Sequence, residues 1–404
     1  MESRNREKEI KLYVIIIAIT AFGLGLSNAV MSNYFKDAYQ VDAFKRGLIE
    51  FPREIPGIIS VFVIAMLSFI SDIKIAMIAQ LLSFVGIMVL GFITPSFNIM
   101  LLFIFINSLG MHLFFPLQDS IGMDLAGQEG LGKKMGRFKG VFTAFQMLSA
   151  VLVFVGFKTG FFTFTSERKW IFILAGFLFL CVFILLFFLE RSVNVTGHTP
   201  QKLNFTLRKE YKYYYYLVIL FGVQKQIMMV YGPWVLIDLL GKKADTLALI
   251  GIVGAFIGIF FMTYLGKWID QFGIKKMLYV DALSFIGVYA IYGFLSAGYV
   301  NGSIKTSGIG VLLAYGILII DRMSTQMGLI RTLYLKSISK DKNDITHTLT
   351  LGQSLDHFVS IICAILGGVI WVNFGPQYIF FLAAFISLGN LYIAVKVKIP
   401  TTVD

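Results

Sequence analysis

Residues 266–276 read GKWIDQFGIKK, a short polar segment at the junction of two apolar stretches, 246–267 and 276–297. A helix needs about 20 apolar residues to cross the hydrocarbon core of a bilayer, and both stretches have that length. The polar segment is therefore predicted to be a turn between two membrane-spanning helices.

Apolar stretches of this length recur along nearly the whole chain. The predicted spans are 10–32, 47–70, 74–93, 97–122, 140–160, 169–189, 212–238, 246–267, 276–297, 307–334, 346–372 and 377–397. The composition is 57% hydrophobic and only 14% charged, whereas a soluble domain carries about 25% charged residues. The first span is expected to be a helix and not a cleaved signal peptide. We predict an all-α integral membrane protein with 12 transmembrane helices.

Lysine and arginine are distributed unevenly between the two predicted faces of the membrane. If the N-terminus is cytoplasmic, 23 of the 35 lie in inside loops and ends, and 9 lie outside. This excess predicts that both termini are cytoplasmic, with the protein in the cell membrane, plasma or inner. It also accounts for the net charge of +12 without a nucleic-acid partner.

The two halves of the chain repeat each other. Residues 82–86 read LSFVG in the third predicted span, and residues 283–287 read LSFIG in the ninth. In spans five and eleven, Thr143, Gln146 and Leu148 match Thr350, Gln353 and Leu355. We expect an N-terminal six-helix bundle at 1–189, a cytoplasmic central loop at 190–211 and a C-terminal six-helix bundle at 212–404, related by pseudo-symmetry. Duplicated halves are typical of transporters.

The chemistry of the polar segment suits a loop that governs helix movement. Gly273 permits a tight turn, and Asp270 can cap or pair at a helix terminus. With Gly266 before them and Lys275 after them, these residues resemble the loop signature of the major facilitator superfamily, between helices 2 and 3 or 8 and 9. The first-half counterpart keeps the aspartate, Asp72, but lacks the turn glycine.

Polar and ionisable side chains inside predicted spans mark a candidate cavity. Each ionisable group costs at least about 2.5 kcal/mol at a helix centre, so such groups face a cavity or one another. The resemblance implies that helices 1, 4, 7 and 10 line a central cavity flanked by 2, 5, 8 and 11. The candidates for binding substrate and coupling ion are Glu50, Arg53, Glu54, Gln118, Asp119, Gln224, Lys225, Asp321, Arg322, Gln353, Asp356 and His357. They lie on the second, fourth, seventh, tenth and eleventh spans.

Several candidates also have a structural interpretation. Arg53 can simply neutralise a glutamate in its own turn. Asp321 and Arg322 point about 100° apart, so only one of them is expected to face the cavity. His357 can equally be a packed neutral imidazole. We predict that Asp119, Lys225, Arg322 and Asp356 converge on one cavity.

These patterns predict a secondary active transporter for a small polar, charged or zwitterionic organic solute, working by alternating access. No phosphate-binding GxxxxGK[ST] stretch occurs, which disfavours ATP-driven transport. Protons are favoured as the coupling ion because buried carboxylates can titrate. The resemblance implies a glycine-rich motif in the fifth helix of drug/proton antiporters, and the fifth span lacks it, which favours symport; sodium coupling and proton-coupled efflux of a metabolite or drug stay open. A membrane-embedded enzyme or a non-transporting receptor is disfavoured. We expect a monomer in the lipid bilayer with no cofactor and no metal.

Overall fold

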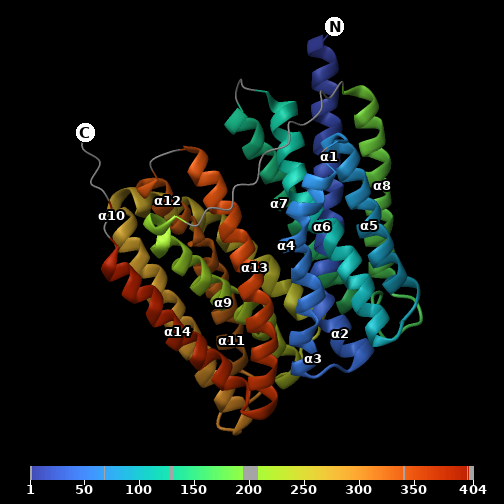
Figure 1. The fold of residues 1–404 in the computed structure, drawn as a ribbon. Helices are drawn as coiled ribbons and strands as arrows, with labels where there is room; N and C mark the ends of the chain where they lie inside the picture. Colours follow the sequence, from blue (N-terminus) through green and yellow to red (C-terminus); the bar gives the residue numbers. More distant parts are fainter. Residues whose placement is uncertain are drawn as a thin grey trace. The chain divides into compact units, whose positions relative to one another are not determined.

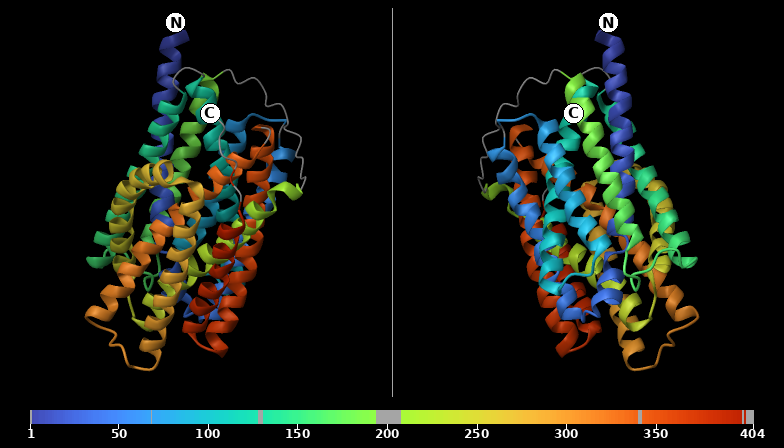
Figure 2. Two further views of the ribbon diagram at one scale, coloured as in Figure 1. Left: turned by 90° about the vertical axis from the view of Figure 1, so that its left-hand side faces the viewer. Right: turned by 90° about the vertical axis from the view of Figure 1, so that its right-hand side faces the viewer.

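The computed structural model describes residues 2–67, 69–127, 131–193, 208–339, 342–397 and 399. Every regular element in these ranges is a helix (Figures 1 and 2). The chain forms two compact units. The first comprises Met1–Gln40, Pro52–Lys202 and Lys243–Leu249, and the second comprises Val41–Phe51, Leu203–Lys242 and Ile250–Asp404.

The first unit is a bundle of long helices. Its helices are α1 (Glu2–Asn28), α2 (Met31–Tyr39), α4 (Glu50–Met66, from Pro52 on), α5 (Asp72–Phe92), α6 (Phe97–Ala126), α7 (Leu131–Lys158) and α8 (Trp170–Ser192). α5 packs against α6 and α8, and α1 packs against α7 and α8. The approach of α5 to α6 depends on glycine, because a Cβ on Gly86 would lie 2.5 Å from the backbone nitrogen of Asn107. Small residues allow such close helix packing in membranes.

The second unit is built around α9. Its elements are α3 (Ala43–Leu48), η1 (Lys209–Tyr211), α9 (Lys212–Trp234), η2 (Val235–Leu239), α10 (Ala244–Val300, from Ile250 on), α11 (Ile309–Gln326), α12 (Gly328–Ile338), α13 (Lys342–Asn373) and α14 (Pro376–Lys396). α9 packs along α13 and α14, and α13 also contacts the short helix α3 (Figure 1). The second unit thus includes a segment, residues 41–51, from the first third of the chain.

Helix α10 contains the turn predicted from the polar segment. Gly273 interrupts its 57 residues with φ 78° and ψ 159°. That backbone conformation is essentially restricted to glycine. The predicted spans 246–267 and 276–297 therefore lie on opposite sides of a break in the helix.

Nine helical stretches in the described ranges are long and apolar enough to cross a membrane. The 57-residue α10 counts as one of them, although it holds two predicted spans. α4 and α9 fall outside the nine, and both carry charged residues within the predicted spans. Helix occupies each of the twelve predicted ranges, but the number of spans stays a prediction. Residues 194–207 of the predicted central loop lie outside the described ranges, so the boundary between six-helix halves also stays a prediction.

Two predicted spans are interrupted in the structure. The span 47–70 begins inside α3, whose N-terminus is capped by the Asp42 carboxylate accepting from the Lys45 amide at 2.7 Å. α4 then begins separately at Glu50. The span 307–334 is divided at Met327 between α11 and α12. Local caps and bends decide these boundaries, and hydrophobicity alone does not reveal them.

Candidate functional site

The second unit brings together two of the predicted cavity charges. Lys225 on α9 forms an ion pair with Asp356 on α13 through its Nζ and the carboxylate Oδ2. The two side chains are 22% and 18% exposed. Both side chains are thus largely shielded from solvent but keep some exposed surface, as a group that binds a solute or an ion must. Since isolated charges are costly in a membrane, the pair explains how both persist within helices.

The surroundings of Asp356 leave part of its carboxylate available. Gly222 faces it from α9, and a Cβ there would lie 2.8 Å from Asp356 Oδ1. That oxygen is buried and has no hydrogen-bond partner in the part of the chain that the structure describes. On the same helix Gln353 is exposed and His357 is half-buried. The pair therefore uses one carboxylate oxygen, and the other is buried without a hydrogen-bond partner among the described residues.

A second charge cluster surrounds Glu50. Arg46 Nη1 lies 2.5 Å from Glu50 Oε1, and both side chains are buried. Gln226 on α9 donates from Nε2 to Glu50 Oε2 at 3.3 Å. Arg46 directly precedes the predicted span 47–70, so the sequence analysis did not include it among the site residues. The i,i+4 spacing of Arg46 and Glu50 is the signal that could have found it.

The other two candidates of α4 belong to the first unit. The backbone carbonyl of Arg53 accepts a hydrogen bond from the Ser108 hydroxyl of α6 at 2.5 Å, so this residue helps to attach α4 to α6. Arg53 is half-buried and Glu54 is buried. Both side chains are therefore shielded from bulk water.

Gln118 and Asp119 lie in the C-terminal half of α6, where they contact α1 and α7. Asp119 Oδ2 lies 3.9 Å from Lys139 Nζ of α7, and the two side chains are 48% and 72% exposed. The carbonyl of Gln118 accepts from the Tyr13 hydroxyl of α1. Asp119 is therefore more accessible than Asp356 and has a long, exposed ion pair. Exposed pairs of this kind contribute little to stability.

Asp321 and Arg322 on α11 differ in their surroundings. The Asp321 side chain is buried, and its Oδ1 has no hydrogen-bond partner in the described ranges. Arg322 donates from Nη1 to the Gly251 carbonyl of α10 at 3.5 Å. A Cβ on Gly254 would lie 2.8 Å from Arg322 Cδ, so glycine makes room for the arginine. Burial without a partner disfavours the charged form of a carboxylate, which makes Asp321 a candidate proton-binding group.

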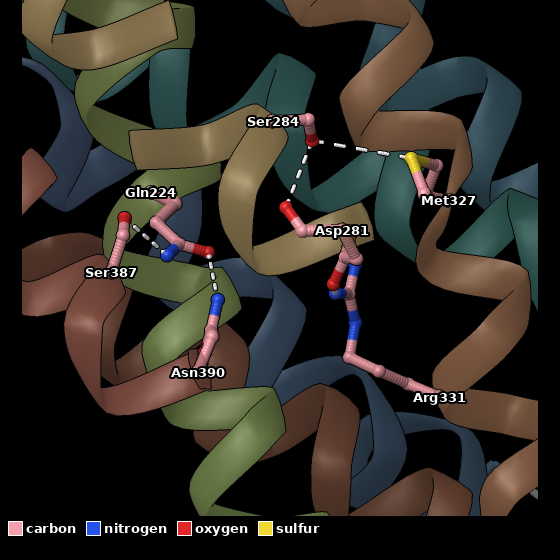
Figure 3. A network of polar contacts seen from close by, with 7 residues as sticks. All are labelled: Gln224, Asp281, Ser284, Met327, Arg331, Ser387 and Asn390. Carbon is pink, nitrogen blue, oxygen red and sulfur yellow. Dashed lines mark hydrogen bonds and ion pairs between the residues drawn. The ribbon is translucent and has the colours of Figure 1, made fainter. Parts of the chain in front are cut away.

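Gln224 has a structural environment, although it precedes Lys225 in the chain (Figure 3). Its Nε2 donates to Ser387 Oγ at 2.6 Å, and its Oε1 accepts from Asn390 Nδ2 at 3.0 Å. The Tyr289 hydroxyl donates to its carbonyl at 2.7 Å. The side chain is fully buried. These contacts join α9 to α14 and α10, and they satisfy both ends of the amide.

The two copies of the loop motif differ in their contacts. Asp270 is exposed, and Lys275 Nζ reaches the Val395 carbonyl of α14 at 3.4 Å. Gly266 lies on the helix with nothing within 4 Å of a Cβ placed there. In the first unit, Asp72 is buried at the start of α5 and accepts from the Ser120 hydroxyl of α6 at 2.6 Å.

A buried pair outside the predicted cavity completes the polar network of the second unit. Arg331 on α12 donates from Nη1 to Asp281 Oδ2 on α10 at 2.6 Å (Figure 3). The guanidinium also lies over the Phe221 ring, 3.8 Å from its centroid. Arg331 lies near the end of the predicted span 307–334 and was not among the predicted site residues. No group of three or more metal-ligating side chains occurs in the described ranges.

Comparisons with known proteins agree with this architecture. The family model described as "Major Facilitator Superfamily" matches residues 13–344. The nucleoside transporter NupG is similar in structure, with a TM-score of 0.73 and 13% identity over 96% of this chain and 100% of that chain. A POT family peptide transporter in an auto-inhibited state gives a TM-score of 0.77 and 12% identity over 98% of each chain. A D-xylose-proton symporter gives 0.67 and 16% identity over 95% and 96%. No curated protein matches the sequence.

Proposed function

This chain belongs to the major facilitator superfamily, and we propose that it is a proton-coupled symporter for a small polar, charged or zwitterionic organic solute. The membership makes it a multi-pass membrane transporter and not an enzyme. The solute class, the coupling ion and the direction of transport are the proposed part. They rest on the charges of α9, α11 and α13.

The observation that carries the proposal is the ion pair between Lys225 and Asp356. It bridges two helices of one unit, remains partly accessible and leaves one carboxylate oxygen without a partner. A solute carboxylate can compete for the ammonium of Lys225, and protonation of Asp356 would release that ammonium. Binding of solute and binding of a proton would then favour the same arrangement, which is what symport requires.

Asp321 supports coupling to protons from a second position. Its carboxylate is buried and Oδ1 has no hydrogen-bond partner among the described residues. Sodium would need several oxygen ligands around such a carboxylate, whereas a proton needs only one oxygen. We therefore propose Asp321 and Asp356 as the groups that take up the coupling proton. Asp119, with its exposed pair to Lys139, is proposed to contact solute or water.

The proposed topology has both termini in the cytoplasm and the protein in the cell membrane as a monomer. The excess of lysine and arginine in the inside loops supports this orientation. In that frame the loop of Asp270 and Gly273 faces the cytoplasm and governs the conformational cycle. Cysteines at Ser303 and Lys336 should then label from opposite faces of intact cells, and labelling from one face would contradict the topology.

The test of the proposed function uses purified protein in liposomes. A thermal-shift screen of polar metabolites identifies a solute, and radiolabelled uptake is then measured with and without an inward pH gradient. Asp356→Asn should abolish gradient-driven accumulation and retain solute exchange. Glu190→Gln is the matched control, because Glu190 forms a different ion pair, with Lys74 at 3.3 Å. Wild-type accumulation in both Asp356→Asn and Asp321→Asn would refute proton coupling.

A further inference from the structure

The first unit contains a cavity that the proposed transport site does not use. Its volume is about 600 Å³, and it lies among the end of α2, the turn after α5 and the segment that precedes α8. Asp37, Thr94, Thr165, Glu167 and Lys169 are among its lining residues. These residues come from one helix and two connecting segments that are far apart in the sequence, so the fold brings them together.

Lys169 is a buried cation in this cavity. It is 2% exposed, which is rare for lysine unless its charge is balanced. Its Nζ donates to the Thr94 hydroxyl and to the Glu167 carbonyl, the latter at 3.1 Å. An ammonium has three donors, so one N–H has no protein partner among the described residues. Burial lowers the pKa of Lys169, and Glu167 raises it; a ligand carboxylate would stabilise the charged form further.

Asp37 lines the same cavity with the opposite charge. It is exposed on α2, and the lysines that act on its charge are Lys243 and Lys36. Among the described residues no ion pair joins Asp37 to Lys169, although both border one space. The cavity therefore presents opposite charges on its two sides, which suits a ligand that carries both charges.

We propose that this cavity is a second binding site, which takes the zwitterion of a free α-amino acid. The ligand carboxylate would accept the remaining N–H of Lys169, and its ammonium would face Asp37. The hydroxyl of Thr165, which shares a hydrogen bond of 2.9 Å with the Thr163 hydroxyl, also borders the cavity. The proposed topology puts this cavity on the outer face, where it would collect solute for the transport site; this role, but not the binding, rests on the proposed function.

The charges of the cavity disfavour simpler ligands. An inorganic anion would meet Lys169 but also the carboxylates of Asp37 and Glu167. A metal cation would meet those carboxylates but also the buried ammonium. A zwitterion satisfies both signs at once, since charge-assisted hydrogen bonds are the stronger kind. Stabilisation by chloride or sodium alone is therefore an outcome that would contradict the proposal.

The experiment measures binding of the twenty standard L-amino acids to the detergent-purified full chain by thermal shift, followed by calorimetric titration of those that stabilise it. The titration is done in wild type and in Asp356→Asn, which disables the proposed transport site. At least one amino acid should bind to both proteins with a similar dissociation constant. Failure of all twenty to bind, or loss of binding in Asp356→Asn, would overturn the second site.

Variants of the cavity locate the binding. Asp37→Asn changes an exposed side chain and should weaken binding at least tenfold, as should Lys169→Gln. Arg168→Gln removes a neighbouring exposed charge that does not line the cavity and should leave binding within twofold. If Lys169→Gln does not fold, Asp37→Asn and Thr165→Val decide the question. Unchanged binding in Asp37→Asn would refute the site, whereas binding of an amino acid that the protein does not transport in liposomes would refute only the role of the cavity in collecting solute.

Discussion

The buried pair of Asp281 and Arg331 leads to a prediction about stability. Removing one charge of the pair should lower the free energy of unfolding much more than replacing both residues with apolar ones. The two side chains are 1% and 4% exposed. They share one hydrogen bond, of 2.6 Å, where arginine and carboxylate can share two. Asp281 Oδ1 and Arg331 Nη2 are buried without a hydrogen-bond partner in the described ranges. The pair is therefore only partly satisfied, and each unsatisfied atom costs about 1–3 kcal/mol.

Asp281→Asn leaves the buried guanidinium without a counter-charge and should lower the free energy of unfolding by about 3–5 kcal/mol. Asp281→Leu combined with Arg331→Met removes both charges. Replacement of a buried pair by apolar side chains is neutral or stabilising by about 1–4 kcal/mol. We therefore expect the double variant to be at least about 3 kcal/mol more stable than Asp281→Asn.

Equilibrium unfolding in mixed micelles, followed by tryptophan fluorescence, measures these differences. Glu7→Gln is the control, because it breaks the pair of Glu7 with Lys11, whose side chains are 67% and 72% exposed. That substitution should leave the unfolding midpoint unchanged, because pairs between exposed side chains contribute little to stability. A double variant that is less stable than Asp281→Asn would show that the pair makes a net favourable contribution, and the reasoning from its unsatisfied atoms would be refuted.

Three further substitutions test packing and the loop. Gly86→Ala would bring a Cβ within 2.5 Å of a backbone nitrogen of α6 and should cost about 1–3 kcal/mol of unfolding free energy, whereas Gly287→Ala, with nothing within 4 Å, should cost nothing. Gly273→Ala should lower the free energy of unfolding by about 1–3 kcal/mol through strain at φ 78°, and it should slow counterflow. Gly266→Ala is the control and should change neither the stability nor the rate of counterflow. Gln224→Leu should lower stability by about 1–3 kcal/mol with KM within twofold of wild type; a large change in KM would show that this amide contacts solute.

The class of fold was predictable from the sequence because the requirements of a bilayer are simple. Length and apolarity indicate where helices cross, and a glycine after a polar turn indicates where α10 breaks. Helix boundaries were less predictable. Asp42 caps the N-terminus of α3, and a bend at Met327 divides α11 from α12. Both features depend on single side chains and on the local backbone. Averaged hydrophobicity does not register either of them.

The candidate site was predictable in part. The cost of burying charge indicated which residues need partners, but it did not indicate which partners they have. Lys225 and Asp356 are 131 positions apart, so no local spacing predicts that they meet. Gln224 was grouped with Lys225 because it is adjacent in sequence. Adjacent helical residues point about 100° apart, and the glutamine instead meets α14 through Ser387.

The two copies of the internal repeat have similar sequences, but residues at matching positions make different contacts. Gly86 and Gly287 end the two copies of the same five-residue motif, yet only Gly86 lies against a neighbouring backbone. The aspartates of the two loops differ in the same way: Asp72 is buried and bonded to Ser120, whereas Asp270 is exposed. A duplicated sequence can therefore keep its turns while each copy acquires different partners. Because ion pairs depend on partners and not on turns, the proton-binding groups that we propose rest on the contacts of α9, α11 and α13 and not on the repeat.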